Sequence, residues 1–460
     1  MTLPPTAWAL CGTIMHTPCR GAVEIIEGAL VEVGPDGAIE AVSAPQSGDF
    51  EHRKTAAANA GHLLKLTPSQ ILLPGLVDLH IHAPQWPQAG KALHLPLNQW
   101  LQEHTFPLEA RYADTAFARR IYAGLVDALL ASGTTTALYF ATVHLESTQA
   151  LAEICLEKGQ RALIGRVAMD DPEQCPHYYR DASAAVGIAQ TDKFIGFVRA
   201  LSGNGAKLVQ PVVTPRFIPS CSDALLDGLG GLAADHQCHV QTHCSESDWE
   251  HHFVLDRLGR SDTASLDGFG LLSERTILAH GNFVSDEDME IISLRGSGIA
   301  HCPLSNFYLS NAVFPLRRAL DKGLHIGLGT DVSGGHSASI LEACRYALVA
   351  SHALEEGTDP RAPAATRGWA GSRIDVLEAF WLATAGGGEA LGLPIGRIEP
   401  GYRFDALLVD TDVADSSVQT FEGMDCLEDV FQKIVYNAQR INLRKVWVEG
   451  KLVVDKTIGA

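Results

Sequence analysis

Eight short apolar segments, most of them separated by helical patterns, constrain the fold of this chain more than any other feature of its sequence. The intervening stretches 114–131 and 223–236, for example, carry apolar residues near helical spacing. Strands that alternate with helices in this number predict an α/β fold of the (β/α)8 TIM-like barrel type. The predicted strands are Ile71–His82, Thr134–Ala141, Ala162–Met169, Ala206–Thr214, His239–His243, Thr276–His280, Gly298–His301 and His325–Thr330.

Both ends of the chain differ in character from this central stretch. They contain short predicted strands separated by turn residues, such as Gly34-Pro35-Asp36-Gly37. Two strand-rich ends that flank a barrel predict one small β-sandwich domain built from both termini. We therefore expect residues 1–70 to form the N-terminal part of that domain, residues 71–395 the barrel, and residues 396–460 the C-terminal part.

The charge balance is acidic, with a formal net charge of −19 and no run of basic residues. This argues against a nucleic-acid partner, because neutralising phosphates requires clusters of Lys and Arg. The ten cysteines include no Cys-x-x-Cys pair, which favours free thiols in a reducing compartment. Without a signal-peptide pattern, or an apolar run of the roughly 20 residues that a membrane span needs, we expect a cytoplasmic protein with no membrane partner.

Side chains that can bind a metal lie where four of the predicted strands end. The first strand ends at His80 and His82, which point to the same face because side chains alternate along a strand. The fifth, sixth and eighth strands end at His243, His280 and Asp331. A single histidine is more often structural, but the C-terminal strand ends of a barrel meet at one mouth. Four histidines and an aspartate there predict a metal site.

The types of ligand suggest the chemistry of this site. Three histidines and one carboxylate suit zinc and leave room for a water molecule, whose pKa the metal would lower to about 7. A carboxylate outside the ligand set is then needed to move protons, and Glu246, three residues after His243, is placed for that role. Glu246 equally fits a charge at a helix N-terminus, where Ser247-Asp248-Trp249-Glu250 reads as a capping box.

Several blocks of the sequence, taken together with these residues, resemble the amidohydrolase superfamily of metal-dependent hydrolases and, within it, the guanine deaminase family. The resemblance extends over nearly the whole chain. It implies a hydrolase acting on a C–N bond of a cyclic amidine, which deaminates free guanine to xanthine and ammonia in purine catabolism or salvage. The blocks that carry it are Pro74–His82, His82–Gln85, Trp100–Pro107, Gly133–Thr142, Val213–Phe217 and Gly327–Gly335.

The same resemblance implies the roles of the metal-site residues. A water activated by zinc would attack C2 of guanine, with Glu246 and Asp331 moving protons. His280 would lie beside that water and orient it or polarise the reacting centre. One zinc ion per subunit would be held by His80, His82, His243 and Asp331.

The resemblance further implies how the base is held. Gln85 and Arg216 would bind the polar edges of guanine, with Arg216 facing the O6 carbonyl through its fixed donors. Phe217 would pack on the purine, since an aromatic face stacks on a heterocycle. A homodimer is also implied. The full set of substrate-binding residues would be Ala83, Pro84, Gln85, Arg216, Phe217, His243, Glu246 and Asp331.

Some positions depart from the family pattern. Leu304 stands where an asparagine is usual, and Trp86 and His336 replace smaller or phenolic aromatic residues. The loop Asp170–Ala182 matches poorly and has no assignment. None of these departures removes a ligand or the proton carrier.

Three other functions compete with this interpretation. A deaminase or chlorohydrolase of another aminoheterocycle is disfavoured by Gln85, Arg216 and Phe217. A non-catalytic binding or assembly protein on the same fold would be expected to have lost ligands, and all of them are intact. Nucleobase editing on RNA would require a basic groove and a zinc signature with cysteine ligands, and the sequence has neither.

Overall fold

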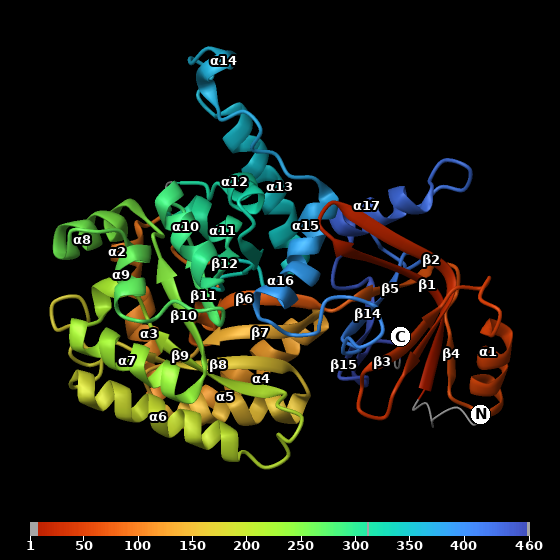
Figure 1. Ribbon diagram of the computed structural model, residues 1–460, viewed down its shortest axis with the longest axis horizontal. Helices are drawn as coiled ribbons and strands as arrows, with labels where there is room; N and C mark the ends of the chain where they lie inside the picture. The colour runs from red at the N-terminus through yellow and green to blue at the C-terminus, as the bar shows by residue number, and fades with distance from the viewer. Residues whose placement is uncertain (1–7, 311, 458–460) are drawn as a thin grey trace.

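The computed structural model describes residues 8–310 and 312–457, and it contains a barrel with a separate sheet beside it (Figure 1). Residues 1–7 of the predicted N-terminal part lie outside the described residues. The predicted (β/α)8 barrel is confirmed: eight parallel strands run in the order β13-β12-β11-β10-β9-β8-β7-β6. Their bounds are β6 (Leu76–His82), β7 (Thr134–Phe140), β8 (Arg161–Ala168), β9 (Val209–Pro215), β10 (His239–Cys244), β11 (Thr276–His280), β12 (Gly298–His301) and β13 (His325–Leu328).

The chain that follows β13 completes the barrel. Strand β13 is short, and residues beyond its end bond to β6: Asp331 N–H donates to the His80 carbonyl (2.8 Å) and His82 N–H donates to the Val332 carbonyl (3.0 Å). The hydrogen bonds that close the barrel therefore also place the predicted ligand Asp331 beside His80 and His82.

Helices surround the barrel, and their ends follow capping rules. Asp114 and Ser222 cap the N-termini of α4 and α7, so the helices predicted over 114–131 and 223–236 are confirmed. Gly159 and Gly296 end α5 and α10 in the left-handed conformation. The main barrel helices are α4 (Thr115–Ala131), α5 (Leu145–Lys158), α6 (Ala184–Ala200), α7 (Asp223–His236), α8 (Asp248–Leu258), α10 (Asp286–Arg295), α13 (Ile340–Glu356) and α15 (Val376–Ala383).

The two ends of the chain meet in a second sheet, as predicted. Its strands follow the order β16-β15-β14-β5-β1-β2-β3, and β4 pairs with β1. Trp8, Phe404 and Trp447 pack together on this sheet, with ring centroids 4.9–5.9 Å apart. The strands are β1 (Trp8–Cys19), β2 (Ala22–Val33), β3 (Ile39–Ser43), β4 (Leu63–Lys65), β5 (Gln70–Pro74), β14 (Ala406–Asp410), β15 (Leu443–Val448) and β16 (Lys451–Asp455).

The prediction of one strand over Ile71–His82 is wrong. Residues Gln70–Pro74 form β5 of the terminal sheet, and Leu76–His82 form β6 of the barrel. The break is at Gly75, whose N–H donates to the Asp405 carbonyl (2.7 Å). A Cβ at Gly75 would lie 2.2 Å from Thr135 Oγ1, so only glycine fits where the chain changes sheets. An unbroken apolar run does not reveal such a change, because both strands are buried.

A buried ion pair joins the two sheets. Arg161, at the start of β8, donates to Asp405 through Nε (3.1 Å) and Nη2 (3.2 Å), and it also pairs with Glu449. Burial raises the pKa of Asp405 above its ordinary value, although Arg161 opposes that shift. Among the residues described here, no helix has both the length and the apolar composition needed to cross a bilayer.

Candidate active site

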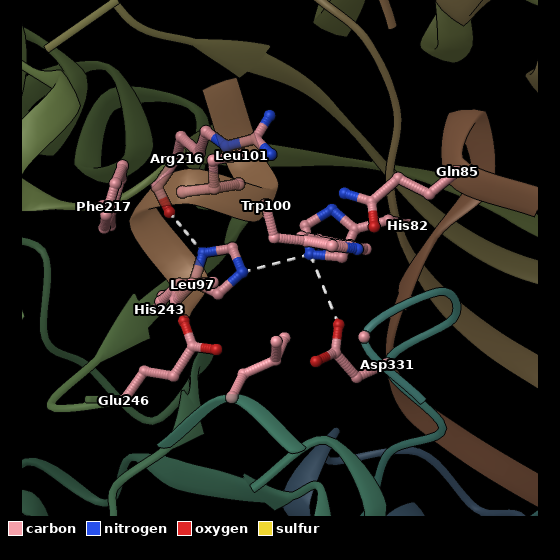
Figure 2. Close-up of a pocket in the computed structure, with 12 residues that line it drawn as sticks. His82, Gln85, Leu97, Trp100, Leu101, Arg216, Phe217, His243, Glu246 and Asp331 are labelled. Carbon is pink, nitrogen blue, oxygen red and sulfur yellow. Dashed lines mark hydrogen bonds and ion pairs between the residues drawn. The ribbon is translucent and has the colours of Figure 1, made fainter. Parts of the chain in front are cut away.

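All five predicted metal-site residues meet at the C-terminal mouth of the barrel. His82 Nε2 lies 3.0 Å from His243 Nε2 and 3.5 Å from Asp331 Oδ1 (Figure 2). His80 Nε2 lies 3.2 Å from Asp331 Oδ1. The fifth residue, His280, ends β11 with Nε2 at 3.9 Å from Asp331 Oδ2. The four strand ends therefore converge as the barrel geometry predicts.

The arrangement of the nitrogen atoms fits a metal ion. Burial lowers the pKa of His80, His82 and His243 well below its ordinary value, so the imidazoles are neutral, as ligands must be. Their donor atoms lie within 4.8 Å of one another. The Nε2 atom of His80 is buried and makes no hydrogen bond with any described residue. Buried imidazole nitrogen atoms whose lone pairs point toward one another would be stabilised by a cation bound between them.

A hydrogen bond to the backbone determines the tautomer of His243. Its Nδ1–H donates to the backbone carbonyl of Arg216 at 2.6 Å. With the proton on Nδ1, the Nε2 lone pair faces the cluster, which is the usual arrangement of a histidine that binds a metal. One residue, Arg216, thus orients a metal-site histidine with its backbone and enters the pocket with its side chain.

A chain of amides fixes His280 in the same way. His280 Nδ1–H donates to Asn306 Oδ1 (2.9 Å), Asn306 Nδ2 donates to Asn282 Oδ1 (2.7 Å), and Asn282 Nδ2 donates to the Glu246 carbonyl (2.8 Å). The Nε2 atom of His280 is left with its lone pair, 3.8 Å from Glu246 Oε1. These three hydrogen bonds link the His280 side chain to the backbone of Glu246, so they fix the position of one residue relative to the other.

Three residues at these strand ends adopt left-handed backbone conformations. The φ angles are +49° at Ser245, +75° at His280 and +46° at Asp331. Such conformations cost about 1–3 kcal/mol each in residues other than glycine and persist where the surrounding structure enforces them, often at functional sites. Here they turn the chain sharply at the barrel mouth, so that neighbouring side chains face inward.

Glu246 is buried beside the cluster. Burial, with a further contribution from the nearby Asp331 carboxylate, raises the pKa of Glu246 well above its ordinary value. A raised pKa favours the protonated form of a carboxyl group, so Glu246 can hold a proton that it takes from a donor, which suits proton transfer. The position of Glu246 therefore agrees with the role inferred from its spacing to His243.

A pair of buried acids behind Glu246 escaped the sequence prediction. The predicted capping box is only half present: Ser247 accepts from Glu250 N–H (3.3 Å), but Glu250 Oε2 accepts from Glu246 N–H (2.8 Å) instead of the N–H of Ser247. The Glu250 carboxyl group also contacts Asp262, which accepts from Ser245 Oγ (3.2 Å). Burial raises the pKa of both acids, that of Asp262 to about 7. The pair anchors the turn that carries Glu246.

Asp78 is a second residue that the sequence prediction missed. It lies inside β6, where it accepts hydrogen bonds from Thr330 N–H (3.0 Å), Thr330 Oγ1 (2.6 Å) and His80 N–H (3.2 Å). Burial raises its pKa to about 7. It therefore ties the end of β6 to the chain before Asp331. The sequence does contain a signal for Asp78: an acidic residue inside an otherwise apolar, buried strand usually has hydrogen-bond partners in the fold.

The cluster opens into a pocket in which the space between atoms, including open solvent at its mouth, is about 340 Å³. Most of the predicted substrate-binding residues line it. Ala83 and Pro84 do not line it; they are buried in the first turn of η1 (Ala83–Gln88). The lining residues are His82, Gln85, Leu97, Trp100, Leu101, Arg216, Phe217, His243, Glu246, Leu309, Asp331 and Gly334 (Figure 2).

Apolar side chains cover the pocket from one segment. Leu97 and Trp100 come from α2 (Leu97–Trp100), and Leu101 begins a π-helical turn over Leu101–Thr105. Turns of this kind are rare and often occur at functional sites. The block Trp100–Pro107 contributes to the family resemblance, but its position over the pocket does not follow from the sequence, because an apolar pattern does not fix where a loop lies.

A third missed residue, Glu109, contacts two residues of the pocket lining, Gln85 and Arg216. It is fully buried. Its carboxylate accepts from Arg216 Nη1 (2.7 Å), Arg216 Nη2 (3.3 Å) and Gln85 Nε2 (2.8 Å). Glu109 is in α3 (Phe106–Ala110), two residues after Pro107. The sequence block that resembles the family ends at Pro107, so it does not include Glu109.

The positions that depart from the family pattern lie outside the pocket lining. Leu304 is buried in α11 (Pro303–Ser305) near Gly335. His336 Nδ1 and Tyr308 Oη are hydrogen-bonded at 3.1 Å, and the partly buried Trp86 packs against a cluster of buried apolar residues that includes Ile81 and Tyr139. In the unassigned loop, Asp170 accepts from Ser222 N–H (2.7 Å), which ties the loop to the start of α7.

Comparison with known proteins gives a consistent result. Residues 71–453 match the Amidohydrolase family. The chain is 38% identical over 454 residues to the probable guanine deaminase of Schizosaccharomyces pombe, covering 96% of this chain and 82% of that protein. It is 38% identical over 459 residues to the guanine deaminase of Mus musculus, covering 98% and 97%. The crystal structure of a guanine deaminase from C. acetobutylicum with bound guanine aligns with a TM-score of 0.86 at 29% identity, covering 97% of this chain and 99% of that chain.

Proposed function

This chain belongs to the amidohydrolase family and, within it, to the guanine deaminases, and we propose on that premise that it hydrolyses free guanine to xanthine and ammonia. One observation carries the proposal: a single pocket joins a metal-binding cluster, a buried carboxyl group able to hold a proton, and an Arg–Gln pair suited to the edge of a base. The alternative of a non-catalytic binding protein does not account for Glu246 beside an intact cluster.

The donor set supports zinc as the ion. We propose that His80, His82, His243 and Asp331 hold one Zn²⁺ per subunit, since three imidazoles and a carboxylate are a usual zinc set. When bound, zinc supplies a Lewis acid that lowers the pKa of water to about 7. The unpartnered Nε2 of His80 and the facing Nε2 atoms of His82 and His243 support this assignment.

The remaining chemistry belongs to side chains of the protein. Glu246 carries a proton from the attacking water to the ring nitrogen next to C2, which makes C2 electrophilic. Asp331 accepts the second proton, and His280 orients the water through its free Nε2. A C2–O bond forms and the C2–N2 bond breaks. The proton that Glu246 delivers stays on the ring nitrogen of xanthine, and the proton that Asp331 accepts passes to N2, so that ammonia leaves. Arg216 and Gln85 hold the edge of the base, and Phe217 packs on its face.

The test is ammonia release from guanine by purified protein of known metal content, with adenine and cytosine as control bases. We expect turnover of guanine that chelation abolishes and added zinc restores. Absence of ammonia release from fully zinc-loaded protein would overturn the proposed function. Restoration by another divalent ion but not by zinc would overturn the choice of ion alone.

Assembly, compartment and domain limits are proposed on narrower grounds. From the family resemblance we propose a cytosolic homodimer, for which light scattering should give twice the chain mass of 49.3 kDa. We propose the division predicted from the sequence with one change: the first limit moves from residue 70 to Gly75, because Gln70–Pro74 form β5 of the terminal sheet. The barrel then spans residues 76–395, and the limit at residue 396 is kept. Limited proteolysis would test it, and cleavage is expected in the exposed segments between the sheets and not within β5 or β6.

A further inference from the structure

Gln85 and Arg216 form the base-binding end of the pocket, and among the described residues Glu109 is the carboxylate that hydrogen-bonds to both. It is 0% exposed, and its two oxygens accept three hydrogen bonds, two from Arg216 and one from Gln85. A buried carboxylate without partners would be very costly. The three bonds therefore hold Glu109, Arg216 and Gln85 as one unit.

The hydrogen bonds of Gln85 determine which way its amide faces. Its Nε2 donates to Glu109 Oε1 (2.8 Å), and its Oε1 accepts from Ser333 N–H (3.2 Å). In Figure 2 the amide nitrogen is turned toward Arg216. A carboxylate accepts only, and a backbone N–H donates only, so a flipped amide would lose both bonds. Gln85 can thus offer the pocket a lone pair of its oxygen.

Arg216 is fixed in the complementary sense. Burial opposes its charge, but the pair with Glu109 leaves its pKa above the ordinary value, so the guanidinium stays protonated. Two of its nitrogen atoms donate to Glu109, and the side chain packs over the Phe106 ring at 5.1 Å. Arginine has five N–H donors and no acceptor, so Arg216 can offer the pocket only donors.

We propose that Glu109 is a positioning residue that sets the hydrogen-bond polarity of the base-binding end, making Gln85 an acceptor and Arg216 a donor. This inference rests on the proposed function. The pattern matches guanine, whose O6 accepts and whose N1–H donates. A purine with an unprotonated N1, such as 2-aminopurine, has an acceptor where guanine has a donor, so it would face the Gln85 oxygen with a lone pair.

The test compares guanine with 2-aminopurine as substrates of wild-type protein and of Glu109→Gln. Glutamine at this position can also donate, so the Gln85 amide is no longer held in one orientation. We expect kcat/KM for guanine to fall, mainly through KM, and the ratio of guanine to 2-aminopurine kcat/KM to fall at least about tenfold, the value of one hydrogen bond. Metal content and circular dichroism should not change.

A matched control separates positioning from the general cost of losing a buried ion pair. Asp181 accepts from Arg166 Nη1 (3.2 Å) in a buried pair that does not line the pocket. Asp181→Asn should leave the guanine to 2-aminopurine ratio at the wild-type value. A change of the ratio in Asp181→Asn as large as in Glu109→Gln would overturn the proposal.

The two possible failures can be told apart. If the wild type releases no ammonia from guanine, the proposed function fails and this inference fails with it. If the wild type deaminates guanine and a folded, metal-loaded Glu109→Gln keeps the wild-type ratio, only the inference fails. Should Glu109→Gln not fold, Gln85→Leu tests the same hydrogen bond from its other end: kcat/KM should fall more for guanine than for 2-aminopurine, so that their ratio falls, and an equal fall for both bases would overturn the proposal.

Discussion

At the metal end of the pocket, formed by His80, His82, His243 and Asp331, the Nε2 atom of His80 has no hydrogen-bond partner among the described residues, and the Nε2 atoms of His82 and His243 face each other at 3.0 Å. At the base-binding end, by contrast, Gln85 and Arg216 are both paired with Glu109. The metal end is thus incomplete without an ion. The base-binding end is complete before any ligand arrives, which lowers the cost of ordering on binding. Variants at the two ends should therefore fail in different ways.

The largest effect is expected from His80→Ala at the metal end. Removing one ligand leaves three donors, and even loss of a residue that only supports a ligand lowers metal affinity by about 10–100-fold. We expect metal occupancy and turnover to fall together, beyond that range in affinity. Metal analysis after dialysis against a weak chelator measures it. A variant that keeps a full complement of metal would remove His80 from the ligand set.

Next in size is Glu246→Gln, which separates proton transfer from metal binding. The amide is nearly the same shape but cannot carry a proton, and positioned acid–base groups contribute about 10²–10⁴-fold to rates. We expect kcat to fall by that factor with zinc content unchanged. Steady-state kinetics on metal-analysed protein checks this. An unaltered kcat would mean that Glu246 has only a structural part at the metal end.

A smaller effect is expected from Arg216→Lys at the base-binding end. Lysine keeps the charge that Glu109 needs, but it cannot reproduce the planar fork of donors. A hydrogen bond to a charged group is worth about 1.5–3 kcal/mol, so KM for guanine should rise by about 10- to 100-fold while metal content stays constant. Loss of zinc in this variant would show that the backbone bond from His243 to Arg216 depends on the side chain, and the contrast between the two ends would not hold.

The smallest effect is a pH dependence of stability from the acid pair behind Glu246. Burial raises the pKa of Asp262 to about 7. The folded protein therefore keeps this proton over a pH range in which the unfolded chain, with a pKa of about 3.9, releases it. Stability from this group is present at acidic pH and is lost as the pH rises from about 4 to about 7.

Asp262→Asn should remove that part of the pH dependence. The groups that face Asp262 are the Glu250 carboxyl group, the Ser245 hydroxyl and His251, whose Nδ1 is 3.9 Å away. They remain in the variant, so the difference between variant and wild type isolates Asp262. Urea denaturation at several values between pH 5 and pH 8 gives the two curves. Parallel curves would mean that Asp262 is ionised throughout this range.

The metal end was predictable from sequence, whereas at the base-binding end the family resemblance supplied Gln85, Arg216 and Phe217 but not Glu109, which supports them. His80, His82, His243, His280 and Asp331 each end or follow an apolar strand, and the barrel brings strand ends together whatever the intervening sequence. The proton carrier Glu246 followed from its spacing to His243. These predictions depend on periodicity and on one topological rule.

Supporting residues could not be predicted in this way because their partners are far apart in sequence. Glu109 bonds to Arg216 across 107 positions, and Asp78 bonds to Thr330 across 252. Glu250 looked like a helix cap because its spacing to Ser247 is that of a capping box, but in the fold it accepts from Glu246 N–H. The change of sheet between β5 and β6 could not be predicted either, because both strands are buried and their sequences form one continuous apolar run.

The order of strands in the terminal sheet has a consequence for synthesis of the chain. Strand β5 pairs with β1 on one side, and its partner on the other side is β14, residues 406–410, near the end of the chain. Until those residues leave the ribosome, β5 is an unpaired edge, and such edges invite pairing with other chains. A chain that stops before residue 406 keeps that edge open permanently. Premature termination should therefore lead to aggregation even when every residue of the catalytic pocket has been made.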